Sequence, residues 1–185
     1  MEPRVMANPN LPPSSNAFAS QNRKDSHMTD ITIRTFRPTD LPVLRQITVD
    51  SFGGVALEQM LEEKFGQWNE RSWKARKADH IDDDCASNPD GVFLAVRNDQ
   101  ILGYITTRVD RHNSRGRIPN MAVTEEARGL GLGRRLINHA LGYFRDQGLH
   151  VAVIETMSNN AVGQHLYPSC GFEEVARQVH YAMKL

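Results

Sequence analysis

The sequence predicts an α/β (α+β) fold in which helices pack against a sheet. Short strand-like runs alternate along the chain with stretches whose apolar residues recur every three or four positions, as on one face of a helix. A glycine-rich connection at residues 128–134 directly follows a strand-like run and directly precedes a helical one. The run 151–154 is apolar on both faces, which is typical of a central strand covered on both sides.

Composition limits the class of protein. The 185 residues fit one ordinary domain, and an apolar fraction of 39% with 24% charged residues is typical of a soluble globular protein. The formal net charge is zero, so we expect neither nucleic acid nor a membrane as a partner. Cys85 and Cys170 lie far apart and without zinc-type spacing, which predicts neither a disulfide framework nor a metal site. A cytoplasmic location is therefore expected.

The first 29 residues differ in composition from the rest. They are rich in Pro, Ser, Asn and Ala and hold no apolar run long enough for a signal peptide or a membrane span. We therefore expect a disordered tail at residues 1–29 and one domain at residues 30–185.

The first part of that domain begins with a strand and continues with helices. Residues 31–36 alternate like a strand, and the Arg37-Pro38-Thr39-Asp40 stretch supplies a cap for the helix that follows. One or two further helices are expected between residues 51 and 88, stopped by a turn rich in Asn, Pro and Gly. The acidic run 82–84, which follows His80, is interpreted as the solvated end of a helix rather than a metal site.

The rest of the domain is predicted to hold most of the sheet and two helices. Helical spacing is found for Leu132, Leu136, Ile137, Ala140, Leu141 and Phe144, and Gly148 stops that helix. A short helix at 160–167 should end before Pro168, since proline disfavours the helical conformation in the residue before it. The predicted strands are 92–96, 101–109, 118–123, 151–154 and 175–185, the last as one strand or a tight pair.

The glycine-rich connection at residues 128–134 is suited to bind phosphate groups. Glycine lets backbone N–H groups approach a ligand, and a helix N-terminus adds unpaired donors and partial positive charge. The spacing does not match a dinucleotide-binding fingerprint, because Arg134 stands where a third glycine is required, nor a P-loop, which needs Gly-Lys-Ser/Thr at its end. A plain connection between a strand and a helix remains the alternative.

The pattern Arg128-x-x-Gly131-x-Gly133, followed by Arg134, resembles the pyrophosphate signature of the GNAT acetyltransferases. The stretch from Asn160 to Phe172 is similar to the second signature of that family. The resemblance implies a GNAT fold with a mixed sheet of about six to seven strands, about four to five flanking helices, and a splay beside strand 4. It also implies acetyl-CoA as co-substrate.

The resemblance further implies which residues hold the cofactor. The pantetheine arm is expected to pair with the backbone of Met121, Ala122 and Val123, and the pyrophosphate to meet the N-terminus of the next helix. Asn160 is expected either to contact the pantetheine arm or simply to cap its helix. The remaining implied contacts are Arg128, Gly129, Leu130, Gly131, Leu132, Gly133 and Arg134, and no metal is implied.

Glu155 and Tyr167 are the candidate catalytic pair. An alkyl ammonium titrates near 10.4 and must lose a proton before it attacks, so a carboxylate at the end of a strand is a suitable base. We expect apolar neighbours to raise the pKa of Glu155. A thiolate leaving group benefits from a hydroxyl donor, which Tyr167 offers. The alternative is that Glu155 only forms an ion pair and that Tyr167 only packs in the core.

The sequence therefore predicts an N-acetyltransferase that moves the acetyl group of acetyl-CoA directly to a primary amine. The alternative is a noncatalytic acyl-CoA sensor. The motifs are most similar to GNAT enzymes that acetylate ribosomal-protein N-termini, but only residues 173–185 follow Phe172, too few for the loop that closes over a peptide in those enzymes. The acceptor, and whether the protein is a monomer or a homodimer, are left open.

Overall fold

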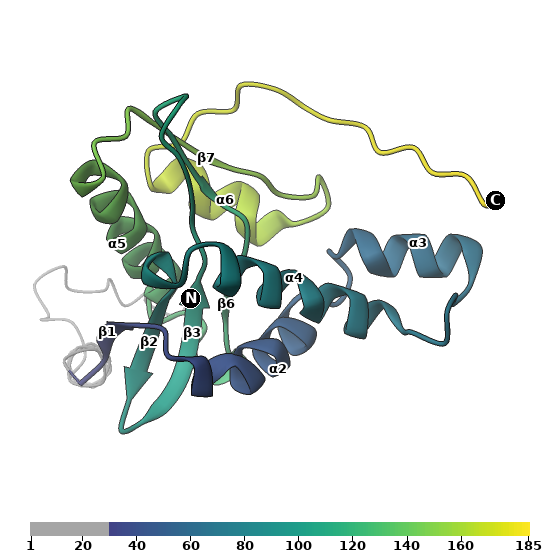
Figure 1. The fold of residues 1–185 in the computed structure, drawn as a ribbon, viewed down its shortest axis with the longest axis horizontal. Helices are drawn as coiled ribbons and strands as arrows, with labels where there is room; N and C mark the ends of the chain where they lie inside the picture. Colours follow the sequence, from purple (N-terminus) through teal and green to yellow (C-terminus); the bar gives the residue numbers. More distant parts are fainter. Residues whose placement is uncertain (1–29) are drawn as a thin grey trace, which may run out of the picture. The chain divides into compact units, whose positions relative to one another are not determined.

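The computed structural model describes residues 30–185, so the tail expected at 1–29 lies outside the described residues. Residues Thr32–Leu185 form one compact unit. Its strands are β1 (Thr32–Thr35), β2 (Phe93–Arg97), β3 (Gln100–Ile105), β4 (Arg108–Asp110), β5 (Arg115–Ile118), β6 (Met121–Val123) and β7 (Val151–Ile154). Its α-helices are α2 (Leu41–Ser51), α3 (Leu57–Phe65), α4 (Trp73–Ser87), α5 (Leu132–Asp146) and α6 (Ala161–Ser169) (Figure 1). Three 3₁₀ turns, η1 (Pro38–Asp40), η2 (Pro89–Gly91) and η3 (Glu125–Ala127), complete the unit.

The predicted fold class is confirmed by the seven strands and five α-helices of the described residues. The strands divide into two sheets, with orders β1-β2-β3-β6 and β4-β5-β7. Pairing is antiparallel throughout except between β5 and β7, which are parallel. The sheets are therefore mixed, as predicted.

The division between the sheets interrupts two runs that the sequence predicted as single strands. The run 101–109 breaks at residues 106–107 into β3 and β4, and the run 118–123 breaks at 119–120 into β5 and β6. Pro119 has no N–H to contribute to a ladder, which favours a break there. Since β7 pairs with β5 and not with β6, the sheet opens beside β6. This opening is the splay expected beside strand 4.

A buried polar network fills the break. Asp84 of α4 is 1% exposed and accepts hydrogen bonds from Thr106 Oγ1 and Asn120 Nδ2, each at 2.7 Å. Arg108 donates to the same carboxylate from Nε at 3.0 Å and Nη2 at 2.8 Å. Lys77 Nζ donates to Asn120 Oδ1 at 2.8 Å, and burial lowers the pKa of Lys77. The network therefore fixes α4 to both strand interruptions.

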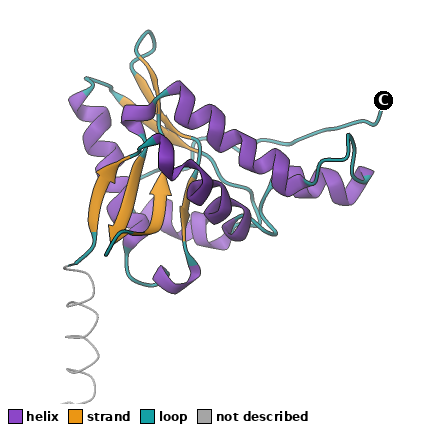
Figure 2. Cartoon of the chain, turned by 60° about the horizontal axis from the view of Figure 1, so that its bottom comes forward, coloured by secondary structure: helices purple, strands orange, loops and turns teal. Residues whose placement is uncertain are grey.

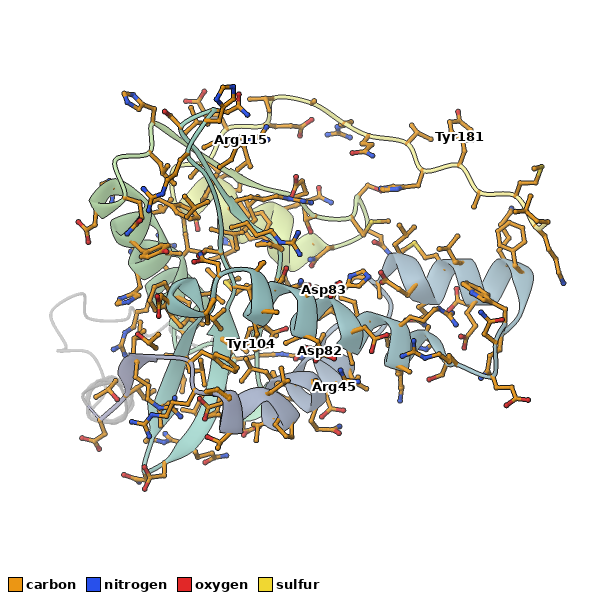
Figure 3. All side chains as sticks on the ribbon, viewed as in Figure 1. Arg45, Asp82, Asp83, Tyr104, Arg115 and Tyr181 are labelled. Atoms are coloured by element: carbon orange, nitrogen blue, oxygen red, sulfur yellow. The ribbon has the colours of Figure 1, made fainter. Side chains whose placement is uncertain are left out.

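The interpretation of residues 82–84 as a solvated acidic run is wrong for two of the three side chains. Asp83 is exposed, but Asp82 forms an ion pair with Arg45 of α2, and Asp84 is buried in the network just described (Figure 3). Asp84 follows Ile81 by three positions and therefore lies on the buried face of α4. The described residues contain no group of three or more ligands able to hold a metal ion.

Apolar cores lie on both faces of the first sheet. Leu94 and Tyr104 pack with Leu44 of α2 and Ile81 of α4. Phe93, adjacent to Leu94 and therefore directed to the opposite face, makes ring contacts with His139 and Tyr143 of α5. Helices thus cover the sheet on two sides, which Figure 2 shows with strands in orange and helices in purple.

Three sequence predictions about the end of the chain are wrong. The strand β7 is not central, because it forms the edge of its sheet and Val151 is 55% exposed. The helix α6 continues through Pro168 to Ser169, since a proline in the last turn costs little of the hydrogen-bond ladder. The stretch 175–185 forms no strand; it is extended and exposed, because no neighbouring strand in the described residues pairs with it.

Candidate active site

The glycine-rich connection joins η3 to the N-terminus of α5. Gly129 and Gly131 have φ angles of +76° and +72°, in the left-handed region that other residues adopt at a cost. Gly131 is the N-cap of α5, and Leu132, 1% exposed, anchors the first turn in the core. The local sequence therefore turns the chain sharply and starts the helix at Leu132.

The first turn of α5 presents backbone donors. Arg135 N–H donates to the carbonyl of Gly131 at 3.2 Å, which is the first bond of the helical ladder. The N–H groups from Gly131 to Arg134 precede that bond and point out of the helix end, where the helix dipole adds partial positive charge. Such a set of donors fits a pyrophosphate.

The two arginines of the signature lie in different surroundings. Arg128 is exposed and lines a cavity of about 680 Å³ together with Asp50, Trp73 and Glu125. Arg134 instead donates from its guanidinium to the carbonyl of Ser169 at 2.6 Å and to its Oγ at 3.0 Å. The Arg134 side chain thus ties α5 to α6, and only its backbone N–H belongs to the donor set.

Replacing Gly131 with alanine is expected to weaken coenzyme A binding about tenfold. A left-handed conformation costs an alanine about 1–2 kcal/mol, so the chain relaxes and the N–H groups at the helix end turn away. Calorimetric titration of the purified variant with coenzyme A measures the change.

Gly142→Ala is the matched control for that variant. Gly142 lies inside α5, and a Cβ there meets no heavy atom within 4 Å. This substitution is expected to leave the affinity unchanged and to raise the free energy of unfolding by about 0.5–1 kcal/mol. Equal losses of affinity in the two variants would contradict a special role for the loop geometry.

The strand β6 offers an open edge beside this loop. Thr124 N–H donates to the carbonyl of Leu102 at 2.9 Å, and Ala122 pairs with β3 two residues earlier in the same ladder. Backbone groups alternate in direction along an antiparallel strand, so those of Met121 and Val123 point away from β3. The open edge therefore presents Met121 and Val123, whereas Ala122 faces β3.

Asn160 and Thr156 organise the start of α6. Asn160 caps the helix, with Oδ1 accepting from Gly163 N–H at 3.1 Å and Nδ2 donating to Thr156 Oγ1 at 2.9 Å. A Cβ at Gly163 would stand 2.8 Å from Thr156 Oγ1, so only glycine fits. Asn160 thus caps its helix, which is one of the two alternatives, and its remaining N–H donor can still contact a ligand.

Tyr167 lies on the inner side of α6. Its ring packs against Phe172 with ring centroids 6.4 Å apart. Burial raises the pKa of the Tyr167 phenol, and a hydrogen bond with the Thr156 side chain offsets part of that rise. The hydroxyl therefore carries its proton at neutral pH and is able to donate it.

Glu155 lies in different surroundings from those expected. Its Oε2 accepts from Arg117 Nε at 3.0 Å, and its side chain is 58% exposed. The apolar neighbours that the sequence predicted are replaced by a cation and solvent. Glu155 directly precedes Thr156, so it stands at the carboxyl end of β7 beside the segment that leads to α6.

Two residues of the candidate site were not predicted from the sequence. Thr156 links the Asn160 cap to the Tyr167 hydroxyl, and Arg117 of β5 orients Glu155. The position of Thr156 directly after Glu155 was the available signal for the first. The Arg117 contact joins residues 38 apart, so only the pairing of β5 with β7 reveals it.

Comparison with known proteins assigns the family. Residues 55–172 match the Acetyltransferase (GNAT) family, which is most of the described chain. The chain belongs to this family, whose members use acetyl-CoA as acetyl donor.

Several curated relatives are mycothiol acetyltransferases. A mycothiol acetyltransferase of Thermomonospora curvata is 33% identical over 153 residues, which cover 82% of this chain and 47% of the relative. A mycothiol acetyltransferase of Rhodococcus jostii is 31% identical, with 83% and 49% covered. The chain thus spans about half the length of the curated relatives that it matches.

Solved structures support the fold. The protein PH1933 of Pyrococcus horikoshii superposes with a TM-score of 0.64 at 21% identity, covering 80% of this chain and 92% of that one. The ribosomal-protein-S18-alanine N-acetyltransferase of Escherichia coli superposes with a TM-score of 0.55 at 22% identity, covering 79% of each chain. No described helix has the length and apolar character that crossing a membrane requires.

Proposed function

We propose that this chain is an acetyl-CoA-dependent N-acetyltransferase that acetylates the primary amine of a small molecule directly, in a ternary complex. The observation that carries the proposal is the juxtaposition of two elements: the donor-rich N-terminus of α5, and the open edge of β6 beside it. A pyrophosphate suits the first and an extended arm with amide groups suits the second.

The proposed cofactor contacts follow from these two elements. The backbone N–H groups of residues 131–134 hold the pyrophosphate, with Arg128 close by on the loop. The backbone groups of Met121 and Val123 pair with the pantetheine arm, and Asn160 adds its amide. The remaining loop residues Gly129, Leu130 and Leu132 supply the turn and its anchor. When bound, acetyl-CoA supplies an activated thioester.

The chain's own groups then manage protons and orientation. Glu155, held by Arg117, accepts a proton from the ammonium form of the acceptor, directly or through water. Tyr167 donates its phenolic proton toward the departing sulfur. The N–H of Met121 or Val123 is a preorganised donor for the carbonyl oxygen.

The acceptor is proposed to be a small mycothiol-related amine. Two relatives that each match over 80% of this chain are mycothiol acetyltransferases. The similarity to a ribosomal-protein N-terminal acetyltransferase supports the fold alone, because the identity is 22%.

A free-thiol release assay with acetyl-CoA tests the proposal. The panel contains a mycothiol-related amine, other small amines and N-terminal peptides. Turnover with a small amine supports the proposal, and turnover with peptides alone would replace the acceptor class. Coenzyme A binding without turnover on any amine would favour the acyl-CoA sensor instead.

Glu155→Gln is expected to lower kcat/KM about 10²-fold at neutral pH. The amide accepts no proton, so the variant depends on the fraction of acceptor that is already neutral. That fraction grows as the pH rises, so the deficit should shrink towards the pKa of the acceptor amine. The pH profile of kcat/KM measures this effect.

Glu174→Gln is the control, because Glu174 is also exposed and also paired with an arginine, Arg177 at 2.7 Å. It should match the parent at every pH. A deficit of Glu155→Gln that stays constant with pH would contradict the role of proton acceptor.

A further inference from the structure

The end of the ladder between β3 and β6 departs from regular strand pairing. Thr106 N–H donates to the Asn120 carbonyl at 2.9 Å, as in an ordinary antiparallel ladder. In such a ladder the Asn120 N–H would return the bond to the main-chain carbonyl of Thr106. It donates instead to the Thr106 hydroxyl oxygen at 3.1 Å. A side chain therefore takes the place of a main-chain acceptor at the point where the sheet opens.

This arrangement sets the direction of the Met121 N–H. The Asn120 carbonyl and the Met121 N–H belong to one peptide unit, and no described peptide bond is cis. In a trans peptide the C=O and the N–H point in opposite directions. Because the carbonyl points at Thr106, directly after β3, the Met121 N–H points away from β3. Within residues 30–185, β6 pairs with β3 alone, so this N–H faces the opening.

Thr106 is held so that it cannot easily release this peptide unit. Its side chain is 0% exposed, and its hydroxyl donates to Asp84 Oδ2 at 2.7 Å, which leaves a lone pair for the Asn120 N–H. The Asn120 side chain donates to the same carboxylate at 2.7 Å and accepts from Lys77 Nζ at 2.8 Å. Both of these partners belong to α4, which lies beside β6 in Figure 1. Rotation of the peptide unit would therefore break at least one buried hydrogen bond.

We propose that Thr106 is a positioning residue of the acetyl transfer, which fixes the peptide unit of Asn120 and Met121 and so aims the Met121 N–H at the thioester oxygen. The inference rests on the proposed function, in which the pantetheine arm runs along β6 from the pyrophosphate loop. Val123 lies nearer to that loop, so the thioester at the far end of the arm reaches Met121.

The benefit of a fixed N–H arises when the amine attacks. The thioester oxygen then becomes an oxyanion, and a donor that needs no reorganisation stabilises the new charge. The Asn120 carbonyl already accepts a hydrogen bond from Thr106, which also strengthens the N–H of the same peptide unit as a donor. Thr106 thus acts on the reaction through Met121 and not by touching the substrate.

Thr106→Val tests the inference, because valine keeps the shape and the main-chain N–H of threonine but has no hydroxyl. The Asn120 N–H loses its acceptor, so the peptide unit is free to turn. We expect kcat to fall about 10- to 100-fold, while KM for acetyl-CoA changes less than about threefold, because the pyrophosphate contacts remain. Thr106→Ser restores the hydroxyl and should recover most of the lost kcat.

Thr107→Val is the matched control. Thr107 is also 0% exposed, and its hydroxyl donates to the Gly91 carbonyl at 2.7 Å and accepts from Asn88 Nδ2 at 2.9 Å. This variant likewise loses buried hydroxyl hydrogen bonds, but its partners lie away from the strand break at 119–120. Both valine variants should lower the midpoint of thermal unfolding by similar amounts, and only Thr106→Val should lower kcat.

Infrared difference spectroscopy detects the hydrogen bond itself. Acetyl-CoA that is isotopically labelled at its carbonyl carbon is bound to each protein without an amine. A hydrogen bond to the thioester oxygen lowers the C=O stretching frequency. The band in the parent, in Thr106→Ser and in Thr107→Val is therefore expected at a lower frequency than the band in Thr106→Val. A loss of stability alone would not shift it.

A fall in kcat and a higher band frequency in Thr106→Val, both reversed in Thr106→Ser and absent from Thr107→Val, support the inference. An unchanged kcat in Thr106→Val, equal falls in the two valine variants, or equal band frequencies overturn it and leave the proposed function standing. A parent that releases no thiol with any amine overturns the proposed function instead. The band comparison then still decides whether Thr106 aims the Met121 N–H.

Discussion

Tyr167→Phe is expected to lower kcat by about 10²- to 10⁴-fold while changing the affinity for coenzyme A less than about twofold. The variant keeps the ring that packs against Phe172 and loses only the hydroxyl that Thr156 orients. Without that hydroxyl, the sulfur must leave without a proton donor. Pre-steady-state and steady-state thiol release, combined with calorimetric titration, separate the two quantities.

The pH dependence of the parent provides a second check on Tyr167. Burial raises the pKa of this phenol, so it stays protonated across the neutral range, and activity that depends on its proton falls only as the pH rises through that elevated value. Tyr143→Phe is the matched control, because its hydroxyl donates to Asn88 on another part of the fold. A comparable fall in kcat in both variants, or none in Tyr167→Phe, would remove Tyr167 from the reaction.

Asp84→Ala is expected to lower the free energy of unfolding by about 3–5 kcal/mol. Removing the carboxylate leaves the guanidinium of Arg108 without its partner and deprives Thr106 and Asn120 of a shared acceptor in the protein interior. Urea unfolding followed by circular dichroism gives the difference.

Asp83→Ala is the control for this variant, since Asp83 is the exposed neighbour of Asp84 on the same helix. It should change stability by no more than about 0.5 kcal/mol. A loss below about 1 kcal/mol in Asp84→Ala would mean that the network is dispensable and that the strand break is held by other contacts.

The parts of the fold that were predictable from the sequence depend on local patterns. The helix α5 was predictable because its buried residues repeat at helical spacing, and the loop before it because Gly129 and Gly131 occupy left-handed positions. The two strand interruptions were not. They depend on Asp84, which lies 22 residues from Thr106 and 36 from Asn120, and no local pattern relates these positions.

The candidate site was also predictable only in part. Spacing alone placed Asn160 and Tyr167 on one helix, but the surroundings of Glu155 depend on Arg117, which becomes its neighbour only when β5 and β7 pair. An apolar run such as β7 does not distinguish a central strand from an edge strand.

The contact between Arg134 and Ser169 joins the start of α5 to the end of α6. Arg134 lies in the first turn of α5, whose backbone N–H groups point out of the helix end. Ser169 is the last residue of α6, the helix that carries Tyr167. Gly133 brings the two helices so close that an added Cβ would stand 2.9 Å from Leu166. Under the proposed function, a displacement at the start of α5 is therefore expected to move α6 as well, so that pyrophosphate binding and the position of the Tyr167 hydroxyl are coupled.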